Sequence, residues 1–119
     1  MKIALWGYGR TGRRFREKLE SAGQGEFKLT AIFDRNWKAM EGRGDVPVLD
    51  PERMPAMYEA GVFRAVIITV AAIAARREME AWLRARGVPC REMWMPESFA
   101  SAEELFGAKP TVSRDGAPD

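Results

Sequence analysis

The sequence contains no histidine and a single cysteine, Cys90. Histidine is the commonest metal ligand and the commonest general base near neutral pH, so its absence argues against most metal and acid–base chemistry. One cysteine cannot form an internal disulfide, which fits a reducing cytoplasm. Because no histidine is present to activate the thiol, we interpret Cys90 as a buried, inert strand residue rather than a nucleophile.

Long apolar runs and a strong charge of either sign are also absent. No run approaches the roughly 20 residues that cross a bilayer, and the residues after Met1 lack the long apolar region of a secretory signal. Nineteen Lys and Arg against 17 Asp and Glu give a net charge of +2, too small to make nucleic acid or a membrane surface the expected partner. We therefore expect a cytoplasmic protein with neither partner.

Recognisable catalytic motifs are missing as well. Gly12 follows Tyr8 by four residues and Val62 follows Tyr58 by four, so the Tyr-x-x-x-Lys pair of short-chain dehydrogenases does not occur. There is no cysteine cluster, no H-E-x-x-H and no Walker A lysine. The sequence thus predicts no catalytic residue and no metal ligand, and it favours binding over catalysis.

What is present is an alternation of strand-like and helix-like segments over 119 residues, enough for one domain. We predict strands at residues 2–6, 27–33, 46–49, 63–70 and 88–95, and helices at 10–22, 51–60, 71–86 and about 96–106. The nearly unbroken apolar run Ala65–Val70 is typical of a parallel strand covered on both faces. This alternation predicts an α/β fold, a Rossmann-like doubly wound parallel sheet of about five strands in the order 3-2-1-4-5.

Proline and polar residues mark the borders of these segments. Pro47 cannot donate a hydrogen bond to a neighbouring strand, so the strand 46–49 is expected at an edge of the sheet. Asp50 is the expected N-cap of the helix that begins with Pro51. We assign residues 1–107 to one dinucleotide-binding domain and 108–119 to a polar C-terminal tail or linker.

The motif that carries chemistry is Gly7-Tyr8-Gly9-Arg10-Thr11-Gly12, a G-x-G-x-x-G directly after the first strand and at the opening of the first helix. In such a motif the first glycine allows a sharp turn, the second lets the backbone approach a diphosphate, and the third lets the helix pack closely on the strand. Unpaired amide groups at the helix start, helped by the helix dipole, bind phosphate oxygens. We predict that these six residues bind a dinucleotide.

Four arginines lie in and after this motif: Arg10, Arg13, Arg14 and Arg16. Arg10 is the one expected to reach a phosphate. For Arg13, Arg14 and Arg16, a solvated helix face is the expected position.

Asp34 ends the second predicted strand, 22 residues after Gly12. A carboxylate there accepts hydrogen bonds from the adenosine ribose hydroxyls and repels a 2′-phosphate, which favours NAD over NADP as the cofactor. The adjacent Arg35 can offset part of that repulsion or lie flat on the adenine, so NADP stays open. The alternative for Asp34 is a solvated cap on the following turn. Thr69, at the end of the fourth predicted strand, is expected to line the same cleft.

Together these residues resemble the small NAD(P)-binding Rossmann domain at the front of bacterial polysaccharide-biosynthesis proteins, near the nucleotide-sugar dehydratase and epimerase group. The resemblance spans residues 2–95 and rests on Lys2–Gly12, Ala31–Asn36, Val46–Leu49 and Ala65–Val70. It implies that Gly7, Gly9, Gly12 and Asp34 bind a dinucleotide. Proteins of this family often continue into a catalytic or membrane-linked portion, so the resemblance by itself does not extend to sugar-modifying activity.

Three functions stay open at this point. The first is an NAD-binding Rossmann module linked to nucleotide-sugar or polysaccharide metabolism. The second is an oxidoreductase of nucleotide sugars that needs a partner subunit or a further domain, and the third is a CoA-binding or structural domain. A homodimer is compatible with the four tryptophans and seven methionines, some of which subunits can bury between them.

Overall fold

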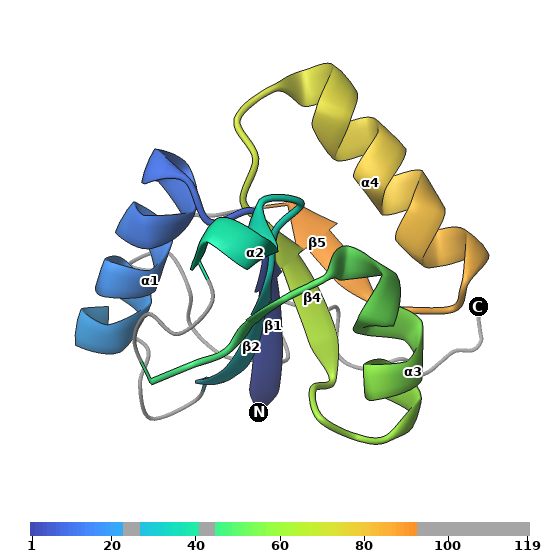
Figure 1. Ribbon diagram of the computed structural model, residues 1–119, viewed down its shortest axis with the longest axis horizontal. Helices are drawn as coiled ribbons and strands as arrows, with labels where there is room; N and C mark the ends of the chain where they lie inside the picture. The colour runs from blue at the N-terminus through green and yellow to red at the C-terminus, as the bar shows by residue number, and fades with distance from the viewer. Residues whose placement is uncertain (23–26, 41–44, 93–119) are drawn as a thin grey trace.

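The computed structural model describes residues 1–22, 27–40 and 45–92, and this part of the chain forms an α/β fold around one five-stranded parallel sheet (Figure 1). The strands are β1 (Lys2–Trp6), β2 (Lys28–Phe33), β3 (Val48–Leu49), β4 (Ala65–Ile68) and β5 (Cys90–Glu92). Their spatial order is β3-β2-β1-β4-β5. The predicted Rossmann-like topology is therefore confirmed.

Four α-helices and one 3-10 turn connect the described strands. They are α1 (Arg10–Ala22), α2 (Trp37–Met40), the 3-10 turn η1 (Pro51–Arg53), α3 (Met54–Glu59) and α4 (Ile73–Ala85). Because the strands all run parallel, their carboxyl ends meet at one edge of the sheet. The segments that follow β1, β2, β3 and β4 thus start from the same edge, which is where ligands bind in open parallel sheets.

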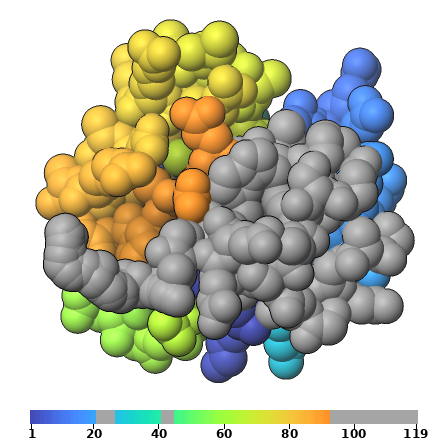
Figure 2. Space-filling model, turned by 180° about the vertical axis from the view of Figure 1, so that it is seen from behind, coloured from blue at the N-terminus to red at the C-terminus, as the bar shows by residue number. Residues whose placement is uncertain are grey.

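The sheet is buried on both faces, which explains its apolar strands. On one face α1 contributes Phe15 and Leu19 to a cluster with Ile3, Leu5, Ile32 and Ile67. On the other face Met54 of α3 and Leu83 of α4 pack with Ala4, Phe33, Val66 and Ile68. Fully burying one such large side chain contributes about 1.5–3 kcal/mol. Figure 1 shows α1 and α4 on opposite sides of the sheet, and Figure 2 shows their surfaces on opposite sides of the molecule.

The predicted borders match β1 but are wider than β2, β3, β4 and β5 within the described residues, and the predicted helix 51–60 is split in two. Met54 N–H donates to the carbonyl oxygen of Pro51, three residues back, so the chain begins as the 3-10 turn η1. An α-helix would need the N–H of residue 55 for that carbonyl, and Pro55 has none. The helix α3 therefore starts anew at Met54. The N-cap prediction is confirmed, because the Asp50 carboxylate accepts from Glu52 N–H at 3.0 Å.

Pro47 directly precedes β3, which lies at the edge of the sheet as predicted. The predicted strand end at residues 93–95, the helix 96–106 and the tail 108–119 lie outside the described residues. Within the described ranges, no helix has the length and apolarity needed to cross a membrane. The cytoplasmic location stays a prediction.

Candidate functional site

A cleft of about 560 Å³ opens where the strands β1, β2 and β3 end. Its apolar lining comes from Trp6 at the end of β1, from Val70 just after β4 and from Met79 of α4. The cleft lies beside the point where β1 meets β2 on one side and β4 on the other. Its volume is within the range of small-molecule sites, about 300–1,000 Å³, and its place is the switch point at which α/β sheets bind ligands.

The glycine turn, residues Gly7–Gly12, borders this cleft at Gly7. Gly7 has φ +110°, a conformation that side chains rarely adopt, and a Cβ there would lie 2.8 Å from Cγ2 of Val70. A Cβ on Gly12 would lie 2.1 Å from the carbonyl oxygen of Gly7. A Cβ on Gly9 would meet no atom within 4 Å. Gly7 and Gly12 are thus needed by the fold itself, whereas Gly9 leaves open space at the turn.

The glycine turn also presents backbone donors. The helical hydrogen bonds of α1 begin with Arg13 N–H, which donates to Gly9 O at 3.0 Å. The N–H groups of residues 10–12 precede that bond and so have no helical acceptor. No acidic residue lies in the first turn of α1. This helix start therefore offers unpaired amides and the positive end of the helix dipole, which suits an anion such as a diphosphate.

Asp34 connects the glycine turn to the end of β2. One carboxylate oxygen, Oδ2, accepts from Tyr8 N–H at 2.7 Å, and the other, Oδ1, accepts from Asn36 N–H at 2.8 Å. Asp34 therefore does cap the turn after β2, the alternative considered from the sequence, and it also lines the cleft. A carboxylate accepts about four hydrogen bonds, so positions remain for ligand hydroxyls.

Thr69 lies beneath the glycine turn, 2% exposed. Its hydroxyl lies within hydrogen-bond distance of two carbonyl oxygens, those of Trp6 (3.0 Å) and Gly7. Its proton is donated to the carbonyl oxygen of Gly7. It thus connects β4 to the start of the turn. The residues that line the described cleft do not include Thr69, and its direct ligand contact stays a prediction.

The remaining predicted site residues take different positions. Arg10 is exposed at the start of α1, and Thr11 is half-buried beside it. Arg35 is exposed and lines both the cleft and a shallower hollow next to it, which also includes Trp37 and Lys38. Tyr8 gives its backbone N–H to Asp34. Its side chain contacts α1, because Arg16 donates to the hydroxyl at 3.0 Å and the Arg13 guanidinium lies 4.7 Å from the ring centre.

The expected solvated position is correct for Arg13 and Arg14, which are exposed, and wrong for Arg16. The Arg16 side chain is only 15% exposed and forms ion pairs with Glu20 and Asp45. Burial by itself lowers the pKa of Arg16, but its hydrogen bonds to Tyr8, Asp45 and Glu20 outweigh burial and raise that pKa above the ordinary value. The hydrogen bond from Arg16 in turn lowers the pKa of the Asp45 carboxyl.

The cleft includes residues that sequence reasoning did not assign to it. Asp50 and Glu52 line it from the end of β3 and from η1, and Glu78 lines it from α4. The predicted strand order could have assigned Asp50 to the cleft, because β3 is the neighbour of β2 and ends at the same edge of the sheet. For α4, the signal is helical spacing, because Ala75, Glu78 and Met79 share one face. Among the described residues, no group of three or more acidic or cysteine side chains is placed to hold a metal ion.

No protein-family model matches the sequence, and no curated protein is detectably similar to it in sequence. Solved structures share its fold. UDP-D-quinovosamine 4-dehydrogenase from Vibrio fischeri matches with a TM-score of 0.63 at 15% identity, covering 91% of this chain and 84% of that one. The Rex-family repressor RSP matches with a TM-score of 0.62 at 17% identity, covering 82% of this chain and 54% of RSP.

The complex of RSP with β-NADH matches with a TM-score of 0.59 at 18% identity, covering 82% of this chain and 55% of that one. This chain therefore spans most of the dehydrogenase but about half of the repressor. At these identities the likeness shows the fold alone, a Rossmann-like α/β fold. RSP has also been solved with β-NAD⁺ and operator DNA, so the expected absence of a nucleic-acid partner here stays a prediction.

Proposed function

We propose that this protein binds NAD in the cleft beside the glycine turn and prefers it to NADP. The observation that carries the proposal is the carboxylate of Asp34, which lines the cleft and is bonded to the glycine turn through Tyr8 N–H at 2.7 Å. In this proposal Asp34 is the acceptor for the ribose, and its bond to Tyr8 joins it directly to the glycine turn that binds the diphosphate. The fold neighbour RSP, solved with β-NADH, supports this choice of ligand.

In this proposal the diphosphate binds the unpaired N–H groups of residues 10–12, and the adenosine ribose donates its hydroxyls to Asp34. The adenine occupies the apolar part of the cleft near Trp6, Val70 and Met79. The same cleft carries the carboxylates of Asp34, Asp50, Glu52 and Glu78 against the single cation of Arg35. An excess of negative charge close to the ribose opposes a 2′-phosphate, which is the basis of the preference for NAD.

Calorimetric titration with NAD, NADH, NADP and CoA tests the proposal. We expect NAD or NADH to bind and NADP to bind at least roughly tenfold more weakly, the equivalent of about 1.4 kcal/mol of uncompensated repulsion. Stronger binding of CoA than of NAD, with competition for one site, would favour the CoA-binding alternative. Absence of heat and of any thermal shift with millimolar NAD and NADH would contradict the proposal.

A second candidate is an oxidoreductase of nucleotide sugars. It is favoured by one observation, the match to UDP-D-quinovosamine 4-dehydrogenase, which covers most of both chains. Its test is the nicotinamide absorbance in the presence of NAD and UDP-sugars. Reduction of the cofactor would establish the enzyme, whereas binding without reduction would leave the protein as a binding module that needs a partner for catalysis.

A further inference from the structure

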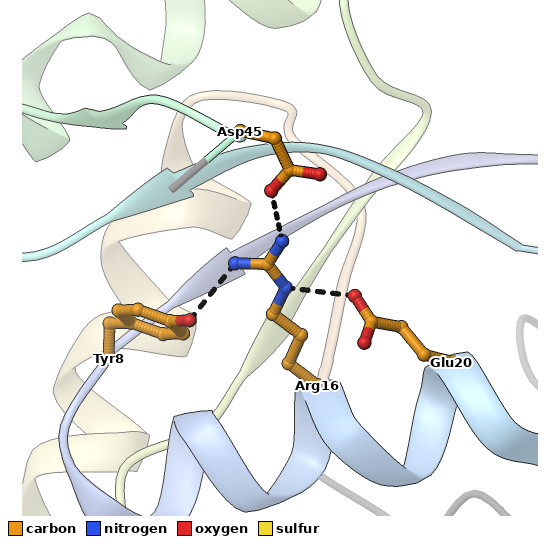
Figure 3. Close-up of polar contacts among 4 residues, drawn as sticks. All are labelled: Tyr8, Arg16, Glu20 and Asp45. Atoms are coloured by element: carbon orange, nitrogen blue, oxygen red, sulfur yellow. Dashed lines mark hydrogen bonds and ion pairs between the residues drawn. The ribbon is translucent and has the colours of Figure 1, made fainter. Parts of the chain in front are cut away.

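The side chain of Tyr8 is attached to α1 by the Arg16 cluster, which comprises Tyr8, Arg16, Glu20 and Asp45 (Figure 3). Arg16 lies on the second turn of α1. Its Nε donates to Glu20 at 3.1 Å, its Nη1 to the Tyr8 hydroxyl at 3.0 Å, and its Nη2 to Asp45 at 2.5 Å. One guanidinium therefore holds three segments together: the glycine turn, the second half of α1 and the segment before β3.

Tyr8 stands between two glycines, where the backbone has the greatest conformational freedom. Gly7 already occupies a conformation that other residues rarely adopt, and nothing packs on Gly9 within 4 Å of its Cβ position. The main chain of Gly7 is held by its own hydrogen bonds, its N–H donating to Phe33 O at 2.8 Å and its carbonyl accepting from Thr69, and the side chain of Tyr8 adds a further anchor to this segment. Its ring lies 4.7 Å from the Arg13 guanidinium, and its hydroxyl accepts from Arg16.

The main chain of Tyr8 is held as well, because its N–H donates to Asp34. Fixing the side chain and the N–H of one residue restricts the peptide groups on both of its sides. The amides that follow in the glycine turn are then presented in one arrangement before a ligand arrives. Such preorganisation raises affinity, since the ligand does not have to order the turn when it binds.

The positive charge of Arg16 is compensated by nearby carboxylates of this cluster. Glu20 and Asp45 pair with it on two sides, and the third donor goes to a neutral phenol. Both carboxylates are exposed, and ion pairs with exposed partners add little to stability, typically about 0–1 kcal/mol. The distinctive consequence of the cluster is thus the position of Tyr8.

We propose that Arg16 is a positioning residue that acts through the Tyr8 hydroxyl to keep the glycine turn in its diphosphate-binding shape. This inference rests on the proposed function for its ligand, NAD. It concerns the diphosphate part of the ligand rather than the adenosine part. The second bond of Asp34, from Asn36 N–H at 2.8 Å, does not involve the glycine turn, so we expect the ribose acceptor to stay in place when the turn relaxes.

The test compares ligands with and without a diphosphate. Tyr8→Phe removes the hydroxyl but keeps the ring, and Arg16→Met removes the guanidinium but keeps an apolar stem. We expect each change to weaken ADP and NAD by roughly five- to twentyfold, the effect of about one hydrogen bond, and adenosine by less than about twofold. Glu20→Gln is the matched control, because it alters another partner of Arg16 and should leave all three affinities within about twofold.

A second measurement needs no ligand. Hydrogen exchange of the residue-8 amide, which is bonded to Asp34, should accelerate at least about fivefold in Tyr8→Phe and Arg16→Met, while the Val66 amide in β4 stays protected as in the wild type. Uniform acceleration would indicate lost stability rather than lost positioning and would overturn the inference, as would equal losses for adenosine and ADP. If the wild type binds neither NAD nor ADP, the proposed function is wrong, and this exchange experiment still decides whether Arg16 positions the turn.

Discussion

The Gly7 carbonyl oxygen lies against Gly12, in the space that a side chain on residue 12 would occupy. A Cβ on Gly12 would stand 2.1 Å from that oxygen. The same Cβ would lie 3.2 Å from the hydroxyl oxygen of Thr69, which itself donates to the Gly7 carbonyl. The start of α1, the end of β1 and the end of β4 therefore meet at one point with no room for a methyl group. A backbone carbonyl cannot turn aside as a flexible side chain can, so this contact constrains the third glycine strictly.

Gly12→Ala should destabilise the fold, whereas Gly9→Ala should weaken ligand binding alone. The first change forces a backbone shift, and we expect it to lower the free energy of unfolding by about 3 kcal/mol, the upper end for overpacking. The second places a methyl group in open space, so the unfolding midpoint in urea should stay close to that of the wild type. That methyl group would stand between the backbone and a diphosphate.

Urea denaturation and NAD titration of both variants check this pair. Unchanged NAD affinity in a folded Gly9→Ala protein would contradict the placement of the diphosphate at the glycine turn. A fully stable Gly12→Ala protein would contradict the close junction of α1 with β1.

Thr69→Val should be more damaging than its small change in shape suggests. The valine fills nearly the same space but has no hydroxyl to donate to the Gly7 carbonyl oxygen, whereas the Trp6 carbonyl keeps its bond from the residue-69 N–H. Leaving a buried carbonyl without its partner costs about 1–3 kcal/mol. Thr69→Ser keeps the hydroxyl and is the matched control. We expect a clear loss of stability in urea for valine and a smaller one for serine, and the opposite order would mean that methyl packing is the main role of Thr69.

The fold was predictable from the sequence because its signals are local and repeated. The boundaries of β1 and α1 were predicted as observed, since the glycine motif marks where one ends and the other begins. The edge position of β3 followed from Pro47. The break between η1 and α3 could have been predicted too, because Pro55 lacks the N–H that a continuous helix needs at that position.

The site was less predictable because it depends on contacts between distant residues. Arg16 and Asp45 are separated by 29 positions, and no local pattern indicates that they meet. A run of arginines on a helix usually faces solvent, and that expectation holds for Arg13 and Arg14. It fails for Arg16 because the Tyr8 hydroxyl and two carboxylates surround its guanidinium. Likewise, Glu78 joins the cleft only because α4 packs over the same face as α3.

Cys90 should react slowly with iodoacetamide at neutral pH while the protein is folded. Burial raises the pKa of this thiol above its ordinary value of 9.0, and the nearby Arg84 offsets only part of that effect. The thiolate is the reactive form, so we expect alkylation at least roughly tenfold slower than in the urea-unfolded chain at the same pH. Mass spectrometry of timed samples measures both rates, and equal rates would show that the thiol is accessible and ionises normally.

The same shift has a consequence for stability at high pH. A thiol whose pKa is higher in the folded than in the unfolded state favours the fold fully below pH 9.0, and this contribution is lost as the pH rises through the folded pKa. Urea midpoints measured on both sides of pH 9 should therefore fall more in the wild type than in Cys90→Ala. The alanine variant is less stable at neutral pH, since it leaves a small cavity, but it lacks this alkaline component.

Asp34→Asn and Arg35→Ala should change the ratio of NAD to NADP affinity in opposite directions. Asparagine keeps one acceptor oxygen but loses the negative charge, so the ratio of NAD to NADP affinity should fall by roughly tenfold, through a weaker hydrogen bond to the ribose of NAD and less repulsion of the 2′-phosphate of NADP. Arg35 is the cation that lines both the cleft and the neighbouring hollow, and its removal should weaken NADP while sparing NAD. Glu59→Gln, an exposed acid that does not line the cleft, controls for the loss of one charge. If the ratio does not respond to Asp34 while NAD still binds, the ribose lies elsewhere and the carboxylate serves only to hold Tyr8 and Asn36 in their turns.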